Sequence, residues 1–142
     1  ALQLINLISY VANLGSIYEP RLSNIENMKQ IETPIPREFL EFVRDALYGA
    51  VNEARGTAYS SKNYDLRHIF GGKTGTAQVR AKKNKDDDLS RASALFKHRN
   101  HGLFVGFNVG AASRRSVAII VEHGGSGGGA AAPIASKIFQ QF

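Results

Sequence analysis

Two short apolar runs, joined by a brief polar link, constrain the fold of this chain more than any other feature. The first, residues 102–109, reads Gly-Leu-Phe-Val-Gly-Phe-Asn-Val, and the second, residues 117–122, reads Val-Ala-Ile-Ile-Val-Glu. Both have the length of a strand and are rich in β-branched or aromatic residues, which favour β-strands. Since the link over residues 110–116 is too short for a crossover helix, it predicts antiparallel pairing of the two strands.

Around this pair the sequence predicts a third strand and flanking helices. Residues 70–80 are strand-like and are entered through a glycine pair. Residues 1–14 are apolar nearly all round, which predicts a buried helix capped by Gly15. A second helix is predicted from Pro36 to Gly56, because apolar residues recur between them at three- and four-residue spacing.

The remaining segments complete an α+β fold with a three-stranded antiparallel sheet. Pro133 opens a closing helix with Ile134, Ile138 and Phe139 on one face. Residues 16–35 contain two prolines and no sustained period, so they predict an irregular connector with one short strand at most. The order of elements is therefore helix, helix, three strands, helix.

Composition narrows the class of protein. A chain of 142 residues with 43% apolar and 21% charged residues suits one globular domain rather than a disordered segment. The absence of cysteine excludes disulfides, thiolate catalysis and cysteine–zinc sites. No apolar run approaches the roughly 18 residues that a membrane span needs.

The net charge of +6 raises the question of nucleic-acid binding, because much of it falls within residues 80–99. Asp86, Asp87 and Asp88 interrupt this basic segment, and few aromatic residues are interleaved with it. We therefore expect residues 82–99 to form a mobile, solvated loop between two paired strands, and we expect no nucleic-acid partner.

The segment with the most chemical content is Lys73-Thr74-Gly75-Thr76. Because side chains alternate along a strand, Lys73 and Gly75 are predicted on one face and the two threonines on the other. Two hydroxyls and a nearby ammonium suit the carboxylate of an extended peptide, and a glycine lets that peptide approach closely. The alternative is a plain strand entry without function. A phosphate-binding loop is excluded, since Arg67 stands where that motif needs glycine.

The succession of motifs resembles the C-terminal half of class B penicillin-binding proteins, most closely the elongation type, penicillin-binding protein 2. The resemblance is carried by residues 71–78 (Gly-Gly-Lys-Thr-Gly-Thr-Ala-Gln), by 101–107 (His-Gly-Leu-Phe-Val-Gly-Phe) and by 117–125 (Val-Ala-Ile-Ile-Val-Glu-His-Gly-Gly). Gly56-Thr57-Ala58 also matches the layout of this family. The resemblance implies the three-stranded portion of the transpeptidase fold shared with serine β-lactamases.

The resemblance also implies roles for individual residues. Lys73 would organise the charge of the site, and Thr74 and Thr76, with Gly75 between them, would hold the carboxylate of a donor peptide or a β-lactam. The backbone N–H of Thr76 would be one oxyanion-hole donor. The implied function is a peptidoglycan D,D-transpeptidase without cofactor or metal. Gly71 departs from the alanine that relatives often have, which should affect packing more than chemistry.

Partners and location follow from the same resemblance. The implied partners are stem peptides ending in D-Ala-D-Ala, β-lactams and the glycosyltransferase of the elongation machinery. The implied location is the periplasmic face of the bacterial inner membrane, with a single-span anchor upstream. Two alternatives share the fold: a β-lactam sensor domain and a catalytically inactive interaction module.

The same family uses Ser-x-x-Lys for its nucleophile, and no serine in this sequence has a lysine three positions on. We therefore expect residues 1–142 to be the C-terminal part of one transpeptidase domain, with a helical part over 1–56 and the sheet and closing helix over 57–142. This piece alone should not form a penicilloyl adduct. Because the family sheet has further strands, we also expect self-association through an open strand edge or through the helix at residues 1–14.

Several other patterns are interpreted as structural. Ser61-Lys62-Asn63 matches the second family motif, Ser-x-Asn, but lies too close to Lys73 in the sequence, and Ser136-Lys137 lacks the nucleophile spacing. His98 and His101 could pair on a metal, yet no third ligand is evident, and Asp86–Asp88 lacks the spacing of a cation site. His68 and His123 are assigned no role.

Overall fold

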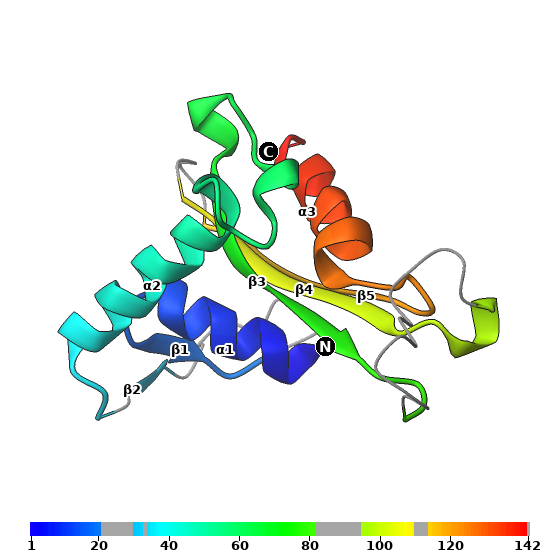
Figure 1. The fold of residues 1–142 in the computed structure, drawn as a ribbon. Helices are drawn as coiled ribbons and strands as arrows, with labels where there is room; N and C mark the ends of the chain where they lie inside the picture. The colour runs from blue at the N-terminus through cyan, green and yellow to red at the C-terminus, as the bar shows by residue number, and fades with distance from the viewer. Residues whose placement is uncertain (21–29, 33, 82–94, 110–113, 142) are drawn as a thin grey trace.

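The computed structural model describes residues 1–20, 30–32, 34–81, 95–109 and 114–141. Its centre is an antiparallel sheet of β3 (Phe70–Ala77), β4 (His101–Asn108) and β5 (Ser116–Val121), in the spatial order β3-β4-β5 (Figure 1). The register places Thr74 opposite Phe104, and Phe104 opposite Ile119. The predicted α+β fold with three antiparallel strands is therefore confirmed, although β3 ends at Ala77 rather than at residue 80.

Helices cover both faces of this sheet (Figure 1). On one face lie α1 (Leu2–Ala12) and α2 (Arg37–Asn52). Gly71 lies close to α2, because an added Cβ would lie 3.1 Å from the Tyr48 backbone nitrogen. An alanine at this position would therefore require α2 to shift by a few tenths of an ångström. On the other face, a π-helical turn (Gly127–Ala131) leads into α3 (Ala132–Phe139).

The main core lies between the sheet and α3. Phe104 is fully buried, and its ring packs edge-on against that of Phe70 at a centroid distance of 5.9 Å. The same ring covers two glycines: a Cβ added at Gly72 or Gly106 would approach Phe104 Cε1 to 2.9 or 2.6 Å. The two glycines in neighbouring strands thus make space for one large aromatic side chain. Phe139 of α3 completes this layer against Phe70.

The helical half differs from the predictions in its details. Residues 16–35 contain two short paired strands, β1 (Ser16–Tyr18) and β2 (Gln30–Glu32), where one was expected. The second helix ends at Asn52, before Gly56. The helix near the N-terminus is not buried all round, since Leu2 and Leu7 are 59% and 61% exposed. Because apolar residues occur on nearly all sides of this helix, its sequence does not show which side packs against the sheet.

The ends of the expected long loop are described only in part. Residues 82–94, which include Asp86–Asp88, lie outside the described residues. Phe96–His98 form a single 3-10 turn that leads into β4. The expectation of a mobile loop over residues 82–99 therefore stays a prediction.

Candidate functional site

The two faces of β3 carry different side chains, as alternation predicts. Thr74 and Thr76 line a hollow on the side of the π-helical turn, whereas Lys73 lines a second hollow against α2. The Lys73 Nζ donates a hydrogen bond to the Thr74 carbonyl oxygen at 2.7 Å. The lysine ammonium therefore lies at the edge of β3 that the Thr74 carbonyl faces.

The hydrogen bonds of β3 show which backbone groups face its open edge. The Phe70 carbonyl accepts from Asn52 Nδ2, and the Thr74 carbonyl accepts from Lys73 Nζ, so neither points toward β4. By contrast, the carbonyl of Ile69, just before β3, accepts from the N–H of Val109, just after β4, and therefore points toward β4. Backbone groups of alternate residues in an antiparallel strand point to opposite sides. The N–H of Thr76, two residues beyond Thr74, consequently points to the open edge.

The hollow beside Thr74 and Thr76 has a volume of about 440 Å³ and is lined almost entirely by hydroxyls and glycines. Thr57 lies against Thr74, with their Oγ1 atoms 2.9 Å apart. The opposite wall is Gly127–Gly129, and a Cβ added at Gly127 would lie 2.6 Å from the Gly75 carbonyl oxygen. The glycines therefore let the turn approach the backbone of β3 and leave the hydroxyls accessible.

Sequence reasoning did not identify Thr57 or the glycines of this turn as parts of the site. In the sequence Gly56-Thr57-Ala58 is only part of the family layout, and the run of glycines near residue 127 has no motif that assigns it to a site. Thr57 lies 17 positions before Thr74. Only the position of the loop after α2 brings the two hydroxyls together.

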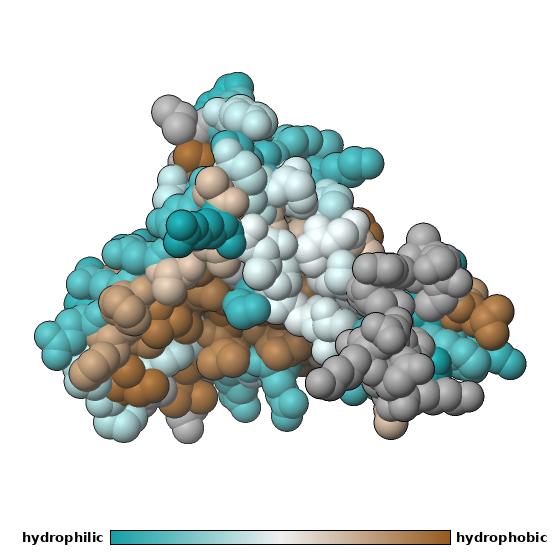
Figure 2. All heavy atoms as spheres, in the orientation of Figure 1, coloured by the Kyte–Doolittle hydropathy of each residue, from teal (hydrophilic) through white to brown (hydrophobic). Residues whose placement is uncertain are grey.

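The hollow on the Lys73 side is apolar. It has a volume of about 380 Å³ and is lined mainly by α2, including Phe42 and Val43. Phe42 is 74% exposed, and apolar side chains gather over the α1 and α2 region in Figure 2 (lower left). No acidic side chain pairs with Lys73 among the described residues, so its ammonium gives this edge of β3 a positive charge.

The structure gives Ser61-Lys62-Asn63 a structural role. Lys62 Nζ donates to the Tyr59 hydroxyl, which raises the pKa of this ammonium, and it also lies over the Tyr64 ring. Asn63 is buried beneath α3, where its Oδ1 accepts from Ser136 Oγ at 2.8 Å and Gln140 Nε2 at 2.7 Å. Its Nδ2 donates to the His68 carbonyl. Asn63 thus anchors the segment before β3 to α3.

We expect Asn63→Ala to destabilise the protein by about 2–4 kcal/mol, because it leaves the buried Ser136 hydroxyl and the half-buried His68 carbonyl without their partner. Urea unfolding followed by circular dichroism measures this loss. The control is Asn52→Ala, since Asn52 makes its side-chain hydrogen bonds nearer the surface. An Asn63→Ala variant as stable as the parent would show that this network contributes nothing.

The histidines lie where strands begin and end. His101 Nδ1 accepts from the His123 backbone N–H at 2.9 Å, and the two rings are 4.9 Å apart. His98 is in the preceding 3-10 turn. Across the described ranges no three histidine, aspartate or glutamate side chains gather as metal ligands would. Within the same ranges, no helix has both the length and the apolar composition of a membrane span.

Comparison with known families gives one match over nearly the whole chain. The family described as "Penicillin binding protein transpeptidase domain" matches residues 1–140. The peptidoglycan D,D-transpeptidase MrdA of Salmonella typhimurium is 31% identical over 100 residues, which cover 70% of this chain and 16% of that protein. MrdA of Haemophilus influenzae is 30% identical over 105 residues, 72% of this chain and 15% of that protein. The chain thus spans about a sixth of the length of these relatives.

Solved structures with the same fold agree with this match. Penicillin-binding protein 2 of Helicobacter pylori, solved in complex with MreC, superposes with a TM-score of 0.70 at 25% identity, over 99% of this chain and 24% of that one. Penicillin-binding protein 2 of Pseudomonas aeruginosa, in complex with WCK 5153, gives a TM-score of 0.66 at 26% identity, over 99% and 29% of the two chains. The D,D-transpeptidase domain of an Eggerthella lenta peptidoglycan glycosyltransferase shares the fold with a TM-score of 0.68 at 23% identity, over 98% and 31%.

Proposed function

Because this chain belongs to the family of penicillin-binding protein transpeptidase domains and resembles penicillin-binding protein 2, we propose that it forms one wall of a peptidoglycan D,D-transpeptidase site. The donor is a stem peptide ending in D-Ala-D-Ala, and a β-lactam occupies the same place. The reaction is acyl transfer through a serine ester, and the serine comes from a Ser-x-x-Lys segment outside these residues.

The observation that carries this proposal is the open edge of β3. The Thr76 N–H points outward there, beside two threonine hydroxyls and the Lys73 ammonium. A peptide that lies along this edge would place its scissile carbonyl oxygen on that N–H, which stabilises the negative charge of the tetrahedral intermediate. The second oxyanion donor would come from the serine that carries the acyl group.

The threonines would bind the terminal carboxylate of the donor. Thr57 and Thr74 share one hydrogen bond, so one hydroxyl donates to the other and the second hydroxyl keeps its proton for a ligand. Thr76 supplies a further hydroxyl on the same wall. Lys73 neutralises part of the carboxylate charge and keeps the site attractive to anions. The glycines of the π-helical turn leave room for the ligand beside these groups.

The partners and place of the whole protein are part of the same proposal. It would act on the periplasmic face of the inner membrane, together with the glycosyltransferase of the elongation machinery. The role in elongation rests on the likeness to MrdA and on a penicillin-binding protein 2 that was solved with MreC. The division into a helical part over residues 1–56 and a sheet part over 57–142 is retained as a proposal.

The test is Thr76→Ala in the full-length natural protein. The change removes one hydroxyl and keeps the N–H, so acylation by a fluorescent penicillin should slow by about tenfold, the effect of one hydrogen bond to a charged group. Thr76→Ser keeps the hydroxyl and should retain most of the rate. An unchanged rate in Thr76→Ala contradicts the carboxylate role of Thr76, and a full-length protein that never becomes labelled contradicts the proposed function itself.

A further inference from the structure

A third hollow, of about 450 Å³, lies on the α1 and α2 face of the sheet, away from Thr74 and Thr76. Its floor is the buried ring of Phe107, and Ala12 at the end of α1 forms one side. Phe107 is opposite Gly71 in the register, which places it on the face that α2 covers. This hollow is therefore separate from the proposed transpeptidase site.

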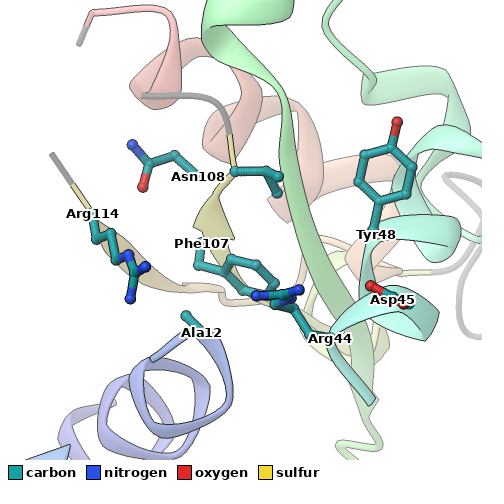
Figure 3. Close-up of a pocket in the computed structure, with 8 residues that line it drawn as sticks. Ala12, Arg44, Asp45, Tyr48, Phe107, Asn108 and Arg114 are labelled. Carbon is teal, nitrogen blue, oxygen red and sulfur yellow. The ribbon is translucent and has the colours of Figure 1, made fainter. Parts of the chain in front are cut away.

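Two arginines enter the hollow from different parts of the chain (Figure 3). Arg44 comes from α2, and Arg114 comes from the residues just before β5. In Figure 3 the Arg114 guanidinium lies to the left of the Phe107 ring, and the Arg44 guanidinium overlaps the ring in this view. Segments 70 positions apart thus bring two permanent positive charges to one apolar floor.

Neither guanidinium is neutralised by an acidic side chain within the described ranges. Arg114 Nη1 donates to Asn13 Oδ1 at 3.0 Å, which is a neutral partner. Arg44 is half-buried, and no hydrogen bond or ion pair joins it to a described residue. By comparison Arg37, about two turns before it on the same helix, is bonded to Glu41 at 2.9 Å. A half-buried cation without a partner is costly, which favours an anion in this place.

The charges in the hollow also select the kind of anion. Asp45 lies on its rim beyond Arg44, so two positive charges and one negative charge leave a net charge of about +1. A monoanionic carboxylate balances that charge, whereas a phosphate with a charge near −2 exceeds it and is repelled by Asp45. Phe107 and Ala12 provide apolar surface in the same hollow as the guanidinium groups.

From this geometry we propose a second anion site in which Arg44 and Arg114 hold a carboxylate that is attached to an apolar group. Such a ligand is a small apolar carboxylic acid or the C-terminus of a peptide with an apolar last residue. The guanidinium groups bind the carboxylate through charge-assisted hydrogen bonds, and the apolar group covers Phe107. The proposal is independent of the transpeptidase function, because it uses none of the residues on the threonine face.

The experiment is ligand-observed NMR titration of the full-length natural protein with N-acetyl-leucine. The matched probes are N-acetyl-leucinamide, which lacks the charge, inorganic phosphate, and a tetrapeptide that ends in leucine. We expect the acid to bind at least tenfold more tightly than the amide and more tightly than phosphate. If the tetrapeptide binds more tightly than N-acetyl-leucine, the ligand is a peptide C-terminus. If N-acetyl-leucine binds more tightly, the ligand is a free small acid.

The variants locate the binding. Arg44→Gln and Arg114→Gln should each weaken N-acetyl-leucine about tenfold or more, whereas Arg37→Gln, with the same charge change on α2, should not. Asp45→Asn should tighten binding, since it removes the negative charge from the rim. The proposal is wrong if N-acetyl-leucine binds as tightly to Arg44→Gln and Arg114→Gln as to the parent, or if Thr76→Ala abolishes its binding. It is also wrong if the amide or phosphate binds as tightly as the acid.

Discussion

Replacing Thr76 by proline is expected to slow acylation by a β-lactam about 10²–10³-fold in the full-length natural protein. Proline removes the backbone N–H that points to the open edge of β3. No hydrogen bond of the ladder between β3 and β4 is lost, because that N–H faces away from β4, and proline is tolerated on edge strands. A slower acylation would therefore result from the missing oxyanion donor and not from a disrupted sheet.

The matched control is Thr76→Ala, which loses the same hydroxyl and keeps the N–H. Thr76→Pro should be at least tenfold slower than Thr76→Ala when the acylation rate constants are measured with the same fluorescent penicillin. Circular dichroism and urea unfolding show whether both variants keep the fold. Equal rates for two folded variants would mean that the Thr76 N–H takes no part in acylation.

Replacing Phe104 by alanine is expected to destabilise the protein by about 3–5 kcal/mol. Its ring is fully buried, packs against Phe70 and covers Gly72 and Gly106. These glycines have no side chains that could move into the space, so the cavity would stay open and the neighbouring atoms would lose their contacts. The free energy of unfolding in urea measures the effect.

Phe42→Ala is the matched control for this cavity, because it deletes the same atoms from a ring that is 74% exposed. Phe42→Ala should change the free energy of unfolding by less than about 0.5 kcal/mol relative to the parent protein. If Phe104→Ala lowers the free energy of unfolding as little as Phe42→Ala, the layer between the sheet and α3 does not hold the fold together as described.

Partial loss of β-lactam acylation is also expected in Phe104→Ala, since Phe104 lies directly opposite Thr74.

The sheet and the two faces of β3 follow from the amino-acid sequence alone. Two short apolar runs with a brief link, together with the strand-like residues 70–80, predict three antiparallel strands. The period of two places Lys73 on one face and the threonines on the other. The family, too, was evident from residues 71–78, and the match over residues 1–140 agrees with it. These properties are local, because each depends on neighbours within one strand or one motif.

Which distant residues share a site depends on how the chain folds in three dimensions. The tertiary structure placed Thr57 against Thr74 and turned Asn63 toward α3. It also brought Arg44 and Arg114 to one hollow, although neither has a motif around it. Pairings of this kind depend on how helices pack on the two faces of the sheet, and the spacing of residues along the chain carries no record of that packing.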